Sequence, residues 1–561
     1  MRIVVLMVHS KRSLVALVLA VLTGLPSLAW AGPRADAEHS EAYFPSGDGR
    51  TTLHADILRP QGMKWNVRTP VIMTVSPYMN QGAGVDPLGE RPNERFYDFL
   101  NLTHILDKGY TYMMVDLPGF GGSGGCNDWG GFREQGAVAA AVEWAASQRW
   151  STGRVGLLGK SYDAWTGLMG IARQPKGLAA VVAMEPVYSG YRYLYTDGVR
   201  FPNSFGTPVL FQAIDAQPGV ATATPRYQIN GAPQAWCYGV NVAMQQQDEP
   251  DVPFWMERDL LVPTIGKRTP LFLTQGFLES NTTPEAAFDF FNGLAGPNRA
   301  WFGQFDHVRG WEKAGKRFHA GRSTFVRELM RFLDHHVKGV PLAKAPVHRD
   351  AKVAVQDNLG RYRAERRWPP ADAKTLWSTL NTGTYTDDGQ NSGAGPSGGN
   401  GVWSFSQALR HDVWMAGEPV LRVAVDTVLP RANLVANVYD VAPNGRATLI
   451  SRGAHLLRGL GAQDAEVDLH GQDWVVRKGH RVGVLVSGSN ADRWSHISTG
   501  TPVTIRSATV AMPFLRQRRT TFLDGTKTPR LDQHLGTGFV TVDRQTVADG
   551  SRTFRLPPPL D

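Results

Sequence analysis

The stretch Gly159-Lys160-Ser161-Tyr162-Asp163 decides how the rest of this chain is interpreted. Before it, Val155-Gly156-Leu157-Leu158 is an apolar run typical of a buried strand, and after it Ala164 to Ala172 is typical of a buried helix. A serine in a sharp turn between strand and helix is the setting of a nucleophile elbow, in which the hydroxyl is lifted above the sheet. Serine at a helix start is also a common N-cap, so the turn alone leaves both interpretations open.

Two further polar residues follow strand-like runs downstream. Residues 269–276 form an apolar run before Glu279, and residues 299–305 form another before His307. A serine hydroxyl needs a base and a third group that orients the base, and α/β-hydrolases carry these groups in the chain order serine, acid, histidine. The pattern predicts Ser161 as nucleophile, Glu279 as acid and His307 as base. The alternatives are a solvated turn carboxylate and a surface imidazole.

Over nearly all of the chain after its first 31 residues, these motifs resemble the X-Pro dipeptidyl-peptidase and cocaine-esterase-like serine hydrolases. The matching segments are Ser76-Pro77-Tyr78, Val115-Asp116, Gly121-Gly122-Ser123-Gly124-Gly125, Trp144-Ala145-Ala146-Ser147-Gln148 with Trp150-Ser151, Gly159-Lys160-Ser161-Tyr162, Phe254-Trp255-Met256-Glu257-Arg258-Asp259, Gly276-Phe277-Leu278-Glu279-Ser280-Asn281 and Asp306-His307-Val308-Arg309-Gly310. The resemblance implies the same triad. The family usually has aspartate where Glu279 stands, and glycine where Ala164 stands.

An oxyanion hole is expected from two donors. The backbone N–H of Tyr162 follows the nucleophile directly, as an elbow requires. The resemblance implies that the Tyr78 phenol is the second donor, whereas the residues alone favour an ordinary rim aromatic after a strand.

The resemblance leaves the substrate open. One hypothesis is a peptidase that removes Xaa-Pro dipeptides from free N-termini and needs a carboxylate for the ammonium group. Glu185, Asp197 and Glu257 are candidates for that carboxylate, each with a structural role as the alternative. The second hypothesis is an esterase or acylase for small acyl or α-amino-acid esters. A sugar-binding protein is a third, because jelly rolls often bind sugars, but the ordered triad argues against it.

Composition restricts the classes of partner. A chain of 561 residues with 42% hydrophobic and 19% charged residues is predicted to fold into two or three domains. The net charge is +9, but the basic residues are scattered and lack the interleaved aromatics of a nucleic-acid groove. We therefore expect a peptide or small-molecule substrate, no nucleic acid and no cofactor, and a homodimer is left open.

The N-terminus predicts export. Lys11-Arg12, the apolar run from Leu14 to Leu22 and Ala29-Trp30-Ala31 form a signal-peptide pattern over residues 1–31, with cleavage near Ala31/Gly32. The product is then periplasmic or secreted, with no membrane association after cleavage. An oxidising compartment permits a disulfide between Cys126 and Cys237, and two separate thiols are the alternative.

The remaining patterns predict the domains. Alternating strands and helices over residues 32–345 predict an α/β-hydrolase catalytic domain. Aromatic and proline-rich residues from about 188 to 267 interrupt this rhythm, and the resemblance implies a helical cap there. Residues 346–561 alternate strands with turns, which predicts an all-β sandwich, a jelly roll by resemblance.

Two other motifs do not indicate a binding site. The run Gly119-Phe120-Gly121-Gly122-Ser123-Gly124 matches a dinucleotide-binding fingerprint, but no helix follows it directly and no acid ends the next strand. We interpret it as a close-packed loop. The pair His335-His336 is adjacent on a predicted helix, so its side chains point apart and no metal site is expected.

Overall fold

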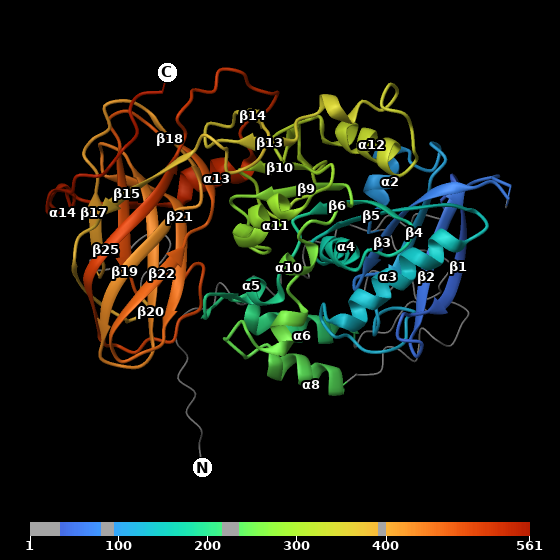
Figure 1. The fold of residues 1–561 in the computed structure, drawn as a ribbon, viewed down its shortest axis with the longest axis horizontal. Helices are drawn as coiled ribbons and strands as arrows, with labels where there is room; N and C mark the ends of the chain where they lie inside the picture. The colour runs from blue at the N-terminus through green and yellow to red at the C-terminus, as the bar shows by residue number, and fades with distance from the viewer. Residues whose placement is uncertain (1–33, 65, 80–94, 216–234, 391–399, 561) are drawn as a thin grey trace, which may run out of the picture.

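The computed structural model describes residues 34–64, 66–79, 95–215, 235–390 and 400–560. The predicted signal peptide at residues 1–31 lies outside these ranges, and so does the part of the predicted cap at residues 216–234. An α/β domain and a β-sandwich lie side by side along the long axis (Figure 1). Among the described residues, no helix is both long and apolar enough to cross a membrane.

A ten-stranded sheet forms the centre of the α/β domain. Its order is β1-β2-β4-β3-β5-β6-β9-β10-β13-β14; the strands from β4 to β13 run parallel, and β1, β2 and β14 pair antiparallel with their neighbours. The strands are β1 (Ala37–Pro45), β2 (Thr52–Pro60), β3 (Thr69–Ser76), β4 (Thr111–Asp116), β5 (Ser151–Lys160), β6 (Leu178–Met184), β9 (Leu271–Gly276), β10 (Arg299–Gly303), β13 (Val353–Gln356) and β14 (Tyr362–Glu365).

Helices cover both faces of this sheet. One face packs against α3 (Phe132–Ser147) and α4 (Tyr162–Arg173), and the other against α2 (Tyr97–Thr103) and α12 (Phe325–His336). Alternation along the strands explains the two cores: Val71 and Met73 of β3 join the first, while Ile72 joins the second. Smaller elements are η1 (Pro284–Ala286), α11 (Ala287–Gly293), β11 (Lys313–Ala314), β12 (Arg317–Phe318) and η2 (Val347–Arg349).

The predicted cap is inserted between β6 and β9. Its elements are α5 (Gly190–Leu194), β7 (Tyr195–Thr196), β8 (Val199–Arg200), α6 (Asn203–Asp215), α8 (Ala235–Met244), α9 (Pro253–Glu257) and α10 (Leu261–Thr264). A disulfide joins Cys126 in the loop after β4 to Cys237 in α8, with 6.1 Å between the two Cα atoms. The covalent bond ties the cap to the core.

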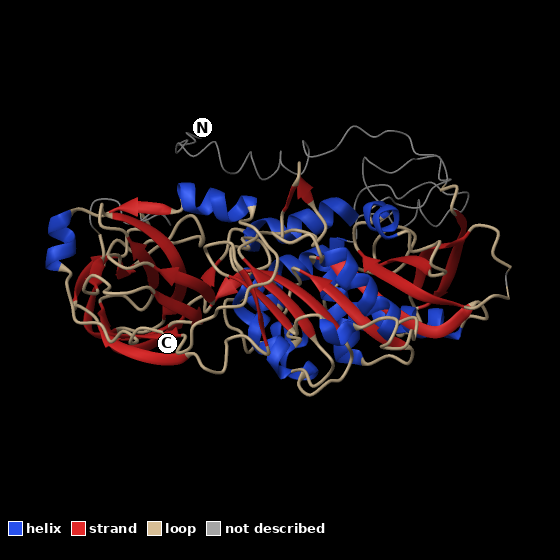
Figure 2. Cartoon of the chain, turned by 90° about the horizontal axis from the view of Figure 1, so that it is seen from above, coloured by secondary structure: helices blue, strands red, loops and turns tan. Residues whose placement is uncertain are grey.

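The C-terminal part is an antiparallel β-sandwich, as predicted, and most of the helices lie at the other end of the molecule (Figure 2). One sheet has the order β22-β19-β25-β18-β23, with β15 and β16 also paired to β25, and the other is β17-β24-β20-β21-β26. The elements are β15 (Lys374–Thr379), β16 (Gly383–Thr386), β17 (Val402–Phe405), β18 (Val413–Gly417), β19 (Val420–Thr427), β20 (Ala432–Val441), β21 (Arg446–Leu457), β22 (Gly461–Asp468), β23 (Gln472–Val476), β24 (Arg481–Ser487), β25 (Pro502–Phe514), α13 (Pro529–Thr537), β26 (Phe539–Thr541) and α14 (Arg544–Asp549).

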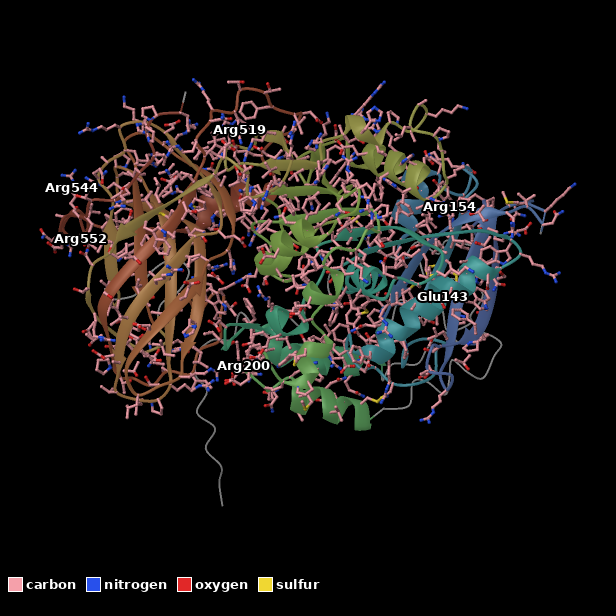
Figure 3. The ribbon with its side chains drawn as sticks, viewed as in Figure 1. Glu143, Arg154, Arg200, Arg519, Arg544 and Arg552 are labelled. Carbon is pink, nitrogen blue, oxygen red and sulfur yellow. A yellow bond between two sulfur atoms is a disulfide. The ribbon has the colours of Figure 1, made fainter. Side chains whose placement is uncertain are left out.

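The sheet pairing extends past the boundary predicted at residue 345. β13 and β14 follow that boundary in sequence but continue the ten-stranded sheet, and the sandwich strands begin only with β15. The connecting segment is held by Arg519, which pairs with Glu365 at the end of β14 and with Asp372 (Figure 3). By strand pairing alone, the two domains meet between residues 365 and 374.

A buried ion pair joins the two domains. Arg363 of β14 donates two hydrogen bonds of 2.7 Å to the carboxylate of Asp473 in β23, and both side chains are inaccessible to solvent. The indoles of Trp368 and Trp414 also donate to Asp473. Because four N–H donors surround this carboxylate, removing the charged partner would leave a desolvated anion only partly satisfied.

We predict that Arg363→Met lowers the free energy of unfolding by about 3–5 kcal/mol, the usual cost of leaving one member of a buried pair alone. Arg422→Met is the control, because Arg422 pairs with Glu466 on the exposed surface, where such pairs contribute about 0–1 kcal/mol. Urea denaturation of both variants measures the difference, and equal small losses would contradict the assigned role of the pair.

Candidate active site

Ser161 occupies a sharp turn between β5 and α4. Its backbone has φ 65° and ψ −127°, a strained conformation for a residue with a side chain. The Ser161 N–H donates to the carbonyl of Met184 at the end of β6, at 2.9 Å, which fixes the turn above the sheet. A Cβ on Gly159 would lie 2.2 Å from the carbonyl carbon of Asp163, so only glycine allows strand and helix to approach this closely. The local geometry is that of a nucleophile elbow.

Glu279 and His307 form a hydrogen-bonded pair at the carboxyl ends of β9 and β10. His307 Nδ1 lies 2.8 Å from Glu279 Oε2; the carboxylate side chain is fully buried, and the imidazole is 21% exposed. The Asn281 N–H donates to Glu279 Oε1 at 2.6 Å. Burial alone would raise the pKa of Glu279, but the charge and hydrogen bond of His307 outweigh it, and the pKa is lowered. The carboxylate therefore stays ionised beside the ring.

The loops that carry this pair are tied to each other. Asp306 Oδ1 accepts hydrogen bonds from the N–H groups of Ser280, at 3.1 Å, and His307, at 3.0 Å. Two arginines of the β-sandwich domain reach the same loops. Arg493 donates to the carbonyl of Glu279 at 3.3 Å, and Arg530 of α13 pairs with Asp306 at 3.2 Å. No sequence pattern pointed to these arginines, because they lie some two hundred residues away from the loops they hold.

The Ser161 hydroxyl interacts with the Tyr78 phenol in this conformation. Among the described residues, no hydrogen bond joins Ser161 to His307, although both follow strands of one sheet at the same edge. Contacts between nucleophile and base are often long in unliganded enzymes and shorten in the substrate complex. The structure thus brings Tyr78 and Ser161 together, and it places His307 beside Glu279 at the same edge of the sheet.

Arg95 links Tyr78 to the elbow. Its guanidinium lies 4.3 Å above the centre of the Tyr78 ring, and its Nε donates to Asp163 Oδ2 at 2.6 Å. Burial raises the pKa of Tyr78, and the positive charge of Arg95 opposes that rise. The net effect keeps the phenol protonated, so Tyr78 can donate a hydrogen bond. Sequence reasoning missed Arg95, which precedes α2 outside any recognisable motif.

Tyr162 has two distinct roles in the structure. It is the first residue of α4, so no carbonyl of an earlier helical turn can accept a hydrogen bond from its N–H. Its phenol donates to Glu134 Oε2 of α3 at 2.6 Å and is buried. The side chain therefore anchors the start of α4, while the backbone N–H directly follows the predicted nucleophile in the turn.

Glu185 is one of the three carboxylates predicted as candidates to bind a substrate ammonium group, and its surroundings disfavour that role. Glu185 is fully buried, and its carboxylate accepts from Gly276 N at 2.9 Å and from the side chains of Thr274 and Gln275 at 3.2 Å. Burial, and next the charge of Glu279, raise the pKa of Glu185 well above its ordinary value. Its position just past a core strand suggested a side chain that a substrate can reach. In the structure the side chain is instead buried beneath the segment that leads from β9 to Glu279.

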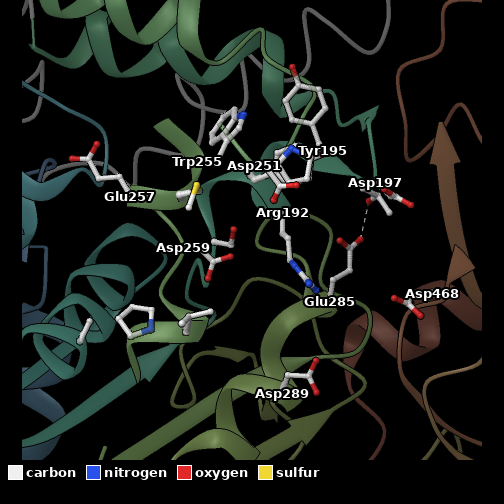
Figure 4. Close-up of a pocket in the computed structure, with 18 of the residues that line it drawn as sticks. Arg192, Tyr195, Asp197, Asp251, Trp255, Glu257, Asp259, Glu285, Asp289 and Asp468 are labelled. Carbon is white, nitrogen blue, oxygen red and sulfur yellow. Dashed lines mark hydrogen bonds between the residues drawn. The ribbon is translucent and has the colours of Figure 1, made fainter. Parts of the chain in front are cut away.

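Asp197 and Glu257 line a cavity of about 1110 Å³ between cap and sandwich (Figure 4). Asp197 pairs with His455 of the sandwich, and Glu257 Oε1 accepts from the N–H of Phe132 at 2.5 Å. The lining contains many acids around Arg192, but none of the three candidate triad residues. Both carboxylates therefore line a cavity whose lining does not include Ser161.

These features define the chain as a serine hydrolase with an α/β-hydrolase core. The model of the X-Pro dipeptidyl-peptidase (S15 family) matches residues 48–309, and that of the X-Pro dipeptidyl-peptidase C-terminal non-catalytic domain matches residues 346–532. The chain therefore belongs to the X-Pro dipeptidyl-peptidase S15 family. The family predicted from the sequence is confirmed.

Individual proteins agree with this membership. The "Putative Xaa-Pro dipeptidyl-peptidase" of Streptomyces avermitilis is 24% identical over 557 residues, covering 80% of this chain and 78% of the relative. A CocE/NonD family hydrolase structure from Staphylococcus aureus has a TM-score of 0.66 at 16% identity, covering 86% of this chain and 97% of that one. An α-amino acid ester hydrolase structure has a TM-score of 0.63 at 16% identity, covering 88% and 99%. The structural matches show the shared fold.

Proposed function

We propose that this serine hydrolase removes Xaa-Pro dipeptides from peptides through an acyl-enzyme. The observation that carries the proposal is the buried Glu279–His307 pair at the same sheet edge as the strained Ser161, in a chain of the S15 family. A buried carboxylate that accepts from one ring nitrogen fixes the tautomer in which the other nitrogen can take a proton. That arrangement supports base catalysis at the serine.

In the proposed mechanism, His307 takes the proton of Ser161 as the hydroxyl attacks the carbonyl carbon. Glu279 holds the Nδ1 proton and stabilises the imidazolium that forms. The Tyr162 N–H and the Tyr78 phenol donate to the oxyanion. The imidazolium then protonates the leaving amine, and water hydrolyses the acyl-enzyme with His307 again as base.

Aromatic side chains around Ser161 support an Xaa-Pro substrate. The ring of Phe211 lies 5.0 Å from that of Tyr162 and 6.1 Å from that of Tyr78, centre to centre. Tyr193 lies by the loop of the acid, where its phenol donates to the Asn281 side chain at 3.1 Å. A compact proline ring packs well against such faces, because it is apolar and rigid.

One observation favours the small acyl esters among the substrates of the alternative, an esterase or acylase for small acyl or α-amino-acid esters. Recognition of a free N-terminus needs a carboxylate near the acyl group, yet Glu185 is buried and Asp197 and Glu257 face another cavity. A substrate without an ammonium group needs no such partner. The two hypotheses share the triad and differ in the leaving group and in the acyl side.

We predict that the protein cleaves alanyl-prolyl anilide faster than short-chain nitrophenyl esters, and that Ser161→Ala loses about 10⁴- to 10⁶-fold in kcat on both. Ser147→Ala, an exposed serine on α3, is the control and should keep full activity. Steady-state kinetics on both substrates make the comparison. Ester cleavage without anilide cleavage would refute the peptidase, and an active Ser161→Ala variant would refute the nucleophile.

For Tyr78→Phe we predict a fall in kcat of about 10²- to 10³-fold with little change in KM, since an oxyanion donor acts mainly in the transition state. Tyr110→Phe removes a phenol that bonds Asp334 away from the site, and it should leave kcat unchanged. A Tyr78→Phe enzyme with normal kcat would show that the phenol is only a wall of the site.

We also propose that the chain is exported, because residues 1–31 carry a signal-peptide pattern and the Cys126–Cys237 disulfide suits an oxidising compartment. Expression of the full chain in a bacterium that exports proteins, followed by N-terminal sequencing, should give a mature protein that begins near Gly32. An N-terminus that still starts at Met1, or at Arg2, would count against export.

A further inference from the structure

Three side chains that can ligate a metal lie together on one face of the β1–β2 pair. Glu41 of β1 lies directly opposite Asp56 of β2, and His54 precedes Asp56 by two residues, so all three point to the same side of the sheet. One ligand atom of each lies within 4.8 Å of the others. His54 and Asp56 are buried, whereas Glu41 is 22% exposed. A ligand could therefore enter past Glu41.

The imidazole of His54 is oriented from behind by a carboxylate. Asp116, at the end of β4, lies 2.8 Å from His54 Nδ1 and also accepts from the N–H of Gly122 at 2.9 Å. The other ring nitrogen, Nε2, faces Glu41 at 3.8 Å. Histidines that bind metals commonly hold one nitrogen to a carboxylate in this way, which leaves the other to meet the ion.

The glycine-rich loop after β4 locks this arrangement. A Cβ on Gly121 would lie 2.3 Å from the Asp116 carboxylate, and one on Gly122 would lie 2.5 Å from the His54 ring. The Ser123 hydroxyl accepts from the N–H of His54 at 2.8 Å and donates to the carbonyl of Asp116 at 2.6 Å. The run that resembled a nucleotide fingerprint is thus the support of the imidazole–carboxylate pair.

We propose that Glu41, His54 and Asp56 bind a divalent zinc ion that fastens the edge strand β1 to the sheet. One imidazole nitrogen and two carboxylate oxygens form a ligand set that Zn²⁺ accepts. His39 Nε2 lies 2.8 Å from Asp56 Oδ1 and is 24% exposed, so it can supply a fourth ligand. A cation here also offsets the mutual repulsion of carboxylates gathered around one ring.

The competing interpretation is a structural ion pair, in which a protonated His54 bridges Asp116 and Glu41 without any metal. Both interpretations predict that removing His54 destabilises the fold, so His54 variants do not separate them. Glu41 does, because its side chain lies at the open side of the cluster and its amide analogue keeps the shape while losing a strong ligand.

The test is calorimetric titration of the full chain with ZnCl₂ after its metals have been stripped with a chelator that is then removed. We expect one equivalent to bind wild type, Glu41→Gln to weaken binding about 10-fold or more, and Asp116→Asn to weaken it about 10- to 100-fold as a supporting residue. Zinc should also raise the Tm of wild type but not of Glu41→Gln. Glu38→Gln is the matched control, because Glu38 is on β1 but faces the other side.

The outcomes are distinct. Absence of zinc binding by wild type overturns the proposal, and so does zinc binding that Glu41→Gln leaves unchanged. Binding that disappears in His335→Gln but persists in Glu41→Gln would assign the ion to the His335-His336 pair and also overturn it. None of these variants touches the candidate triad, so hydrolase activity serves as a check that each has folded.

Discussion

The backbone of Ser161 is the constraint on which the proposed chemistry depends. Holding a serine at φ 65° costs about 1–3 kcal/mol, and such strain persists only where the surroundings enforce it. Here the Met184 carbonyl receives the serine N–H, and Gly159 lets α4 approach β5. The same turn starts the helix at Tyr162 and places Asp163 where Arg95 can bind it. One strained residue therefore positions the nucleophile and both proposed oxyanion donors.

Much of the fold and of the triad follows from local sequence patterns. Alternating strands and helices predicted the parallel sheet, and strands alternating with turns predicted the sandwich, because each pattern repeats over a few residues. The cap was predicted from the break in the first pattern together with the family resemblance. Glu279 and His307 were predicted because each follows a buried strand, and parallel strands end at a common edge. The structure adds the distance between them, 2.8 Å from His307 Nδ1 to Glu279 Oε2.

Other features were beyond that reasoning for physical reasons. Glu185 also follows a core strand, yet burial depends on what covers a position, and here the segment after β9 covers it. Strands β13 and β14 follow the point where the sequence changes from alternating strands and helices to strands and turns, but they pair with the ten-stranded sheet. Strand pairing depends on which strands are neighbours in space, and the local sequence pattern does not reveal that. Arg95, Arg493 and Arg530 act through contacts with residues far away in the sequence, which leave no periodic signal. The cluster of Glu41, His54 and Asp56 depends on strand register, which ligand spacing along the chain does not reveal.

The two sandwich arginines at the acid and base loops have a consequence for how the protein is divided. A fragment that stopped after β14 would keep every side chain of the candidate triad, but the loops at Glu279 and Asp306 would lose the cations that brace them from outside. The β-sandwich domain carries none of the candidate triad residues, but its two arginines hold the loops of the acid and the base. Exchanging either half for another would break these contacts, so the two halves have to match at the acid and base loops.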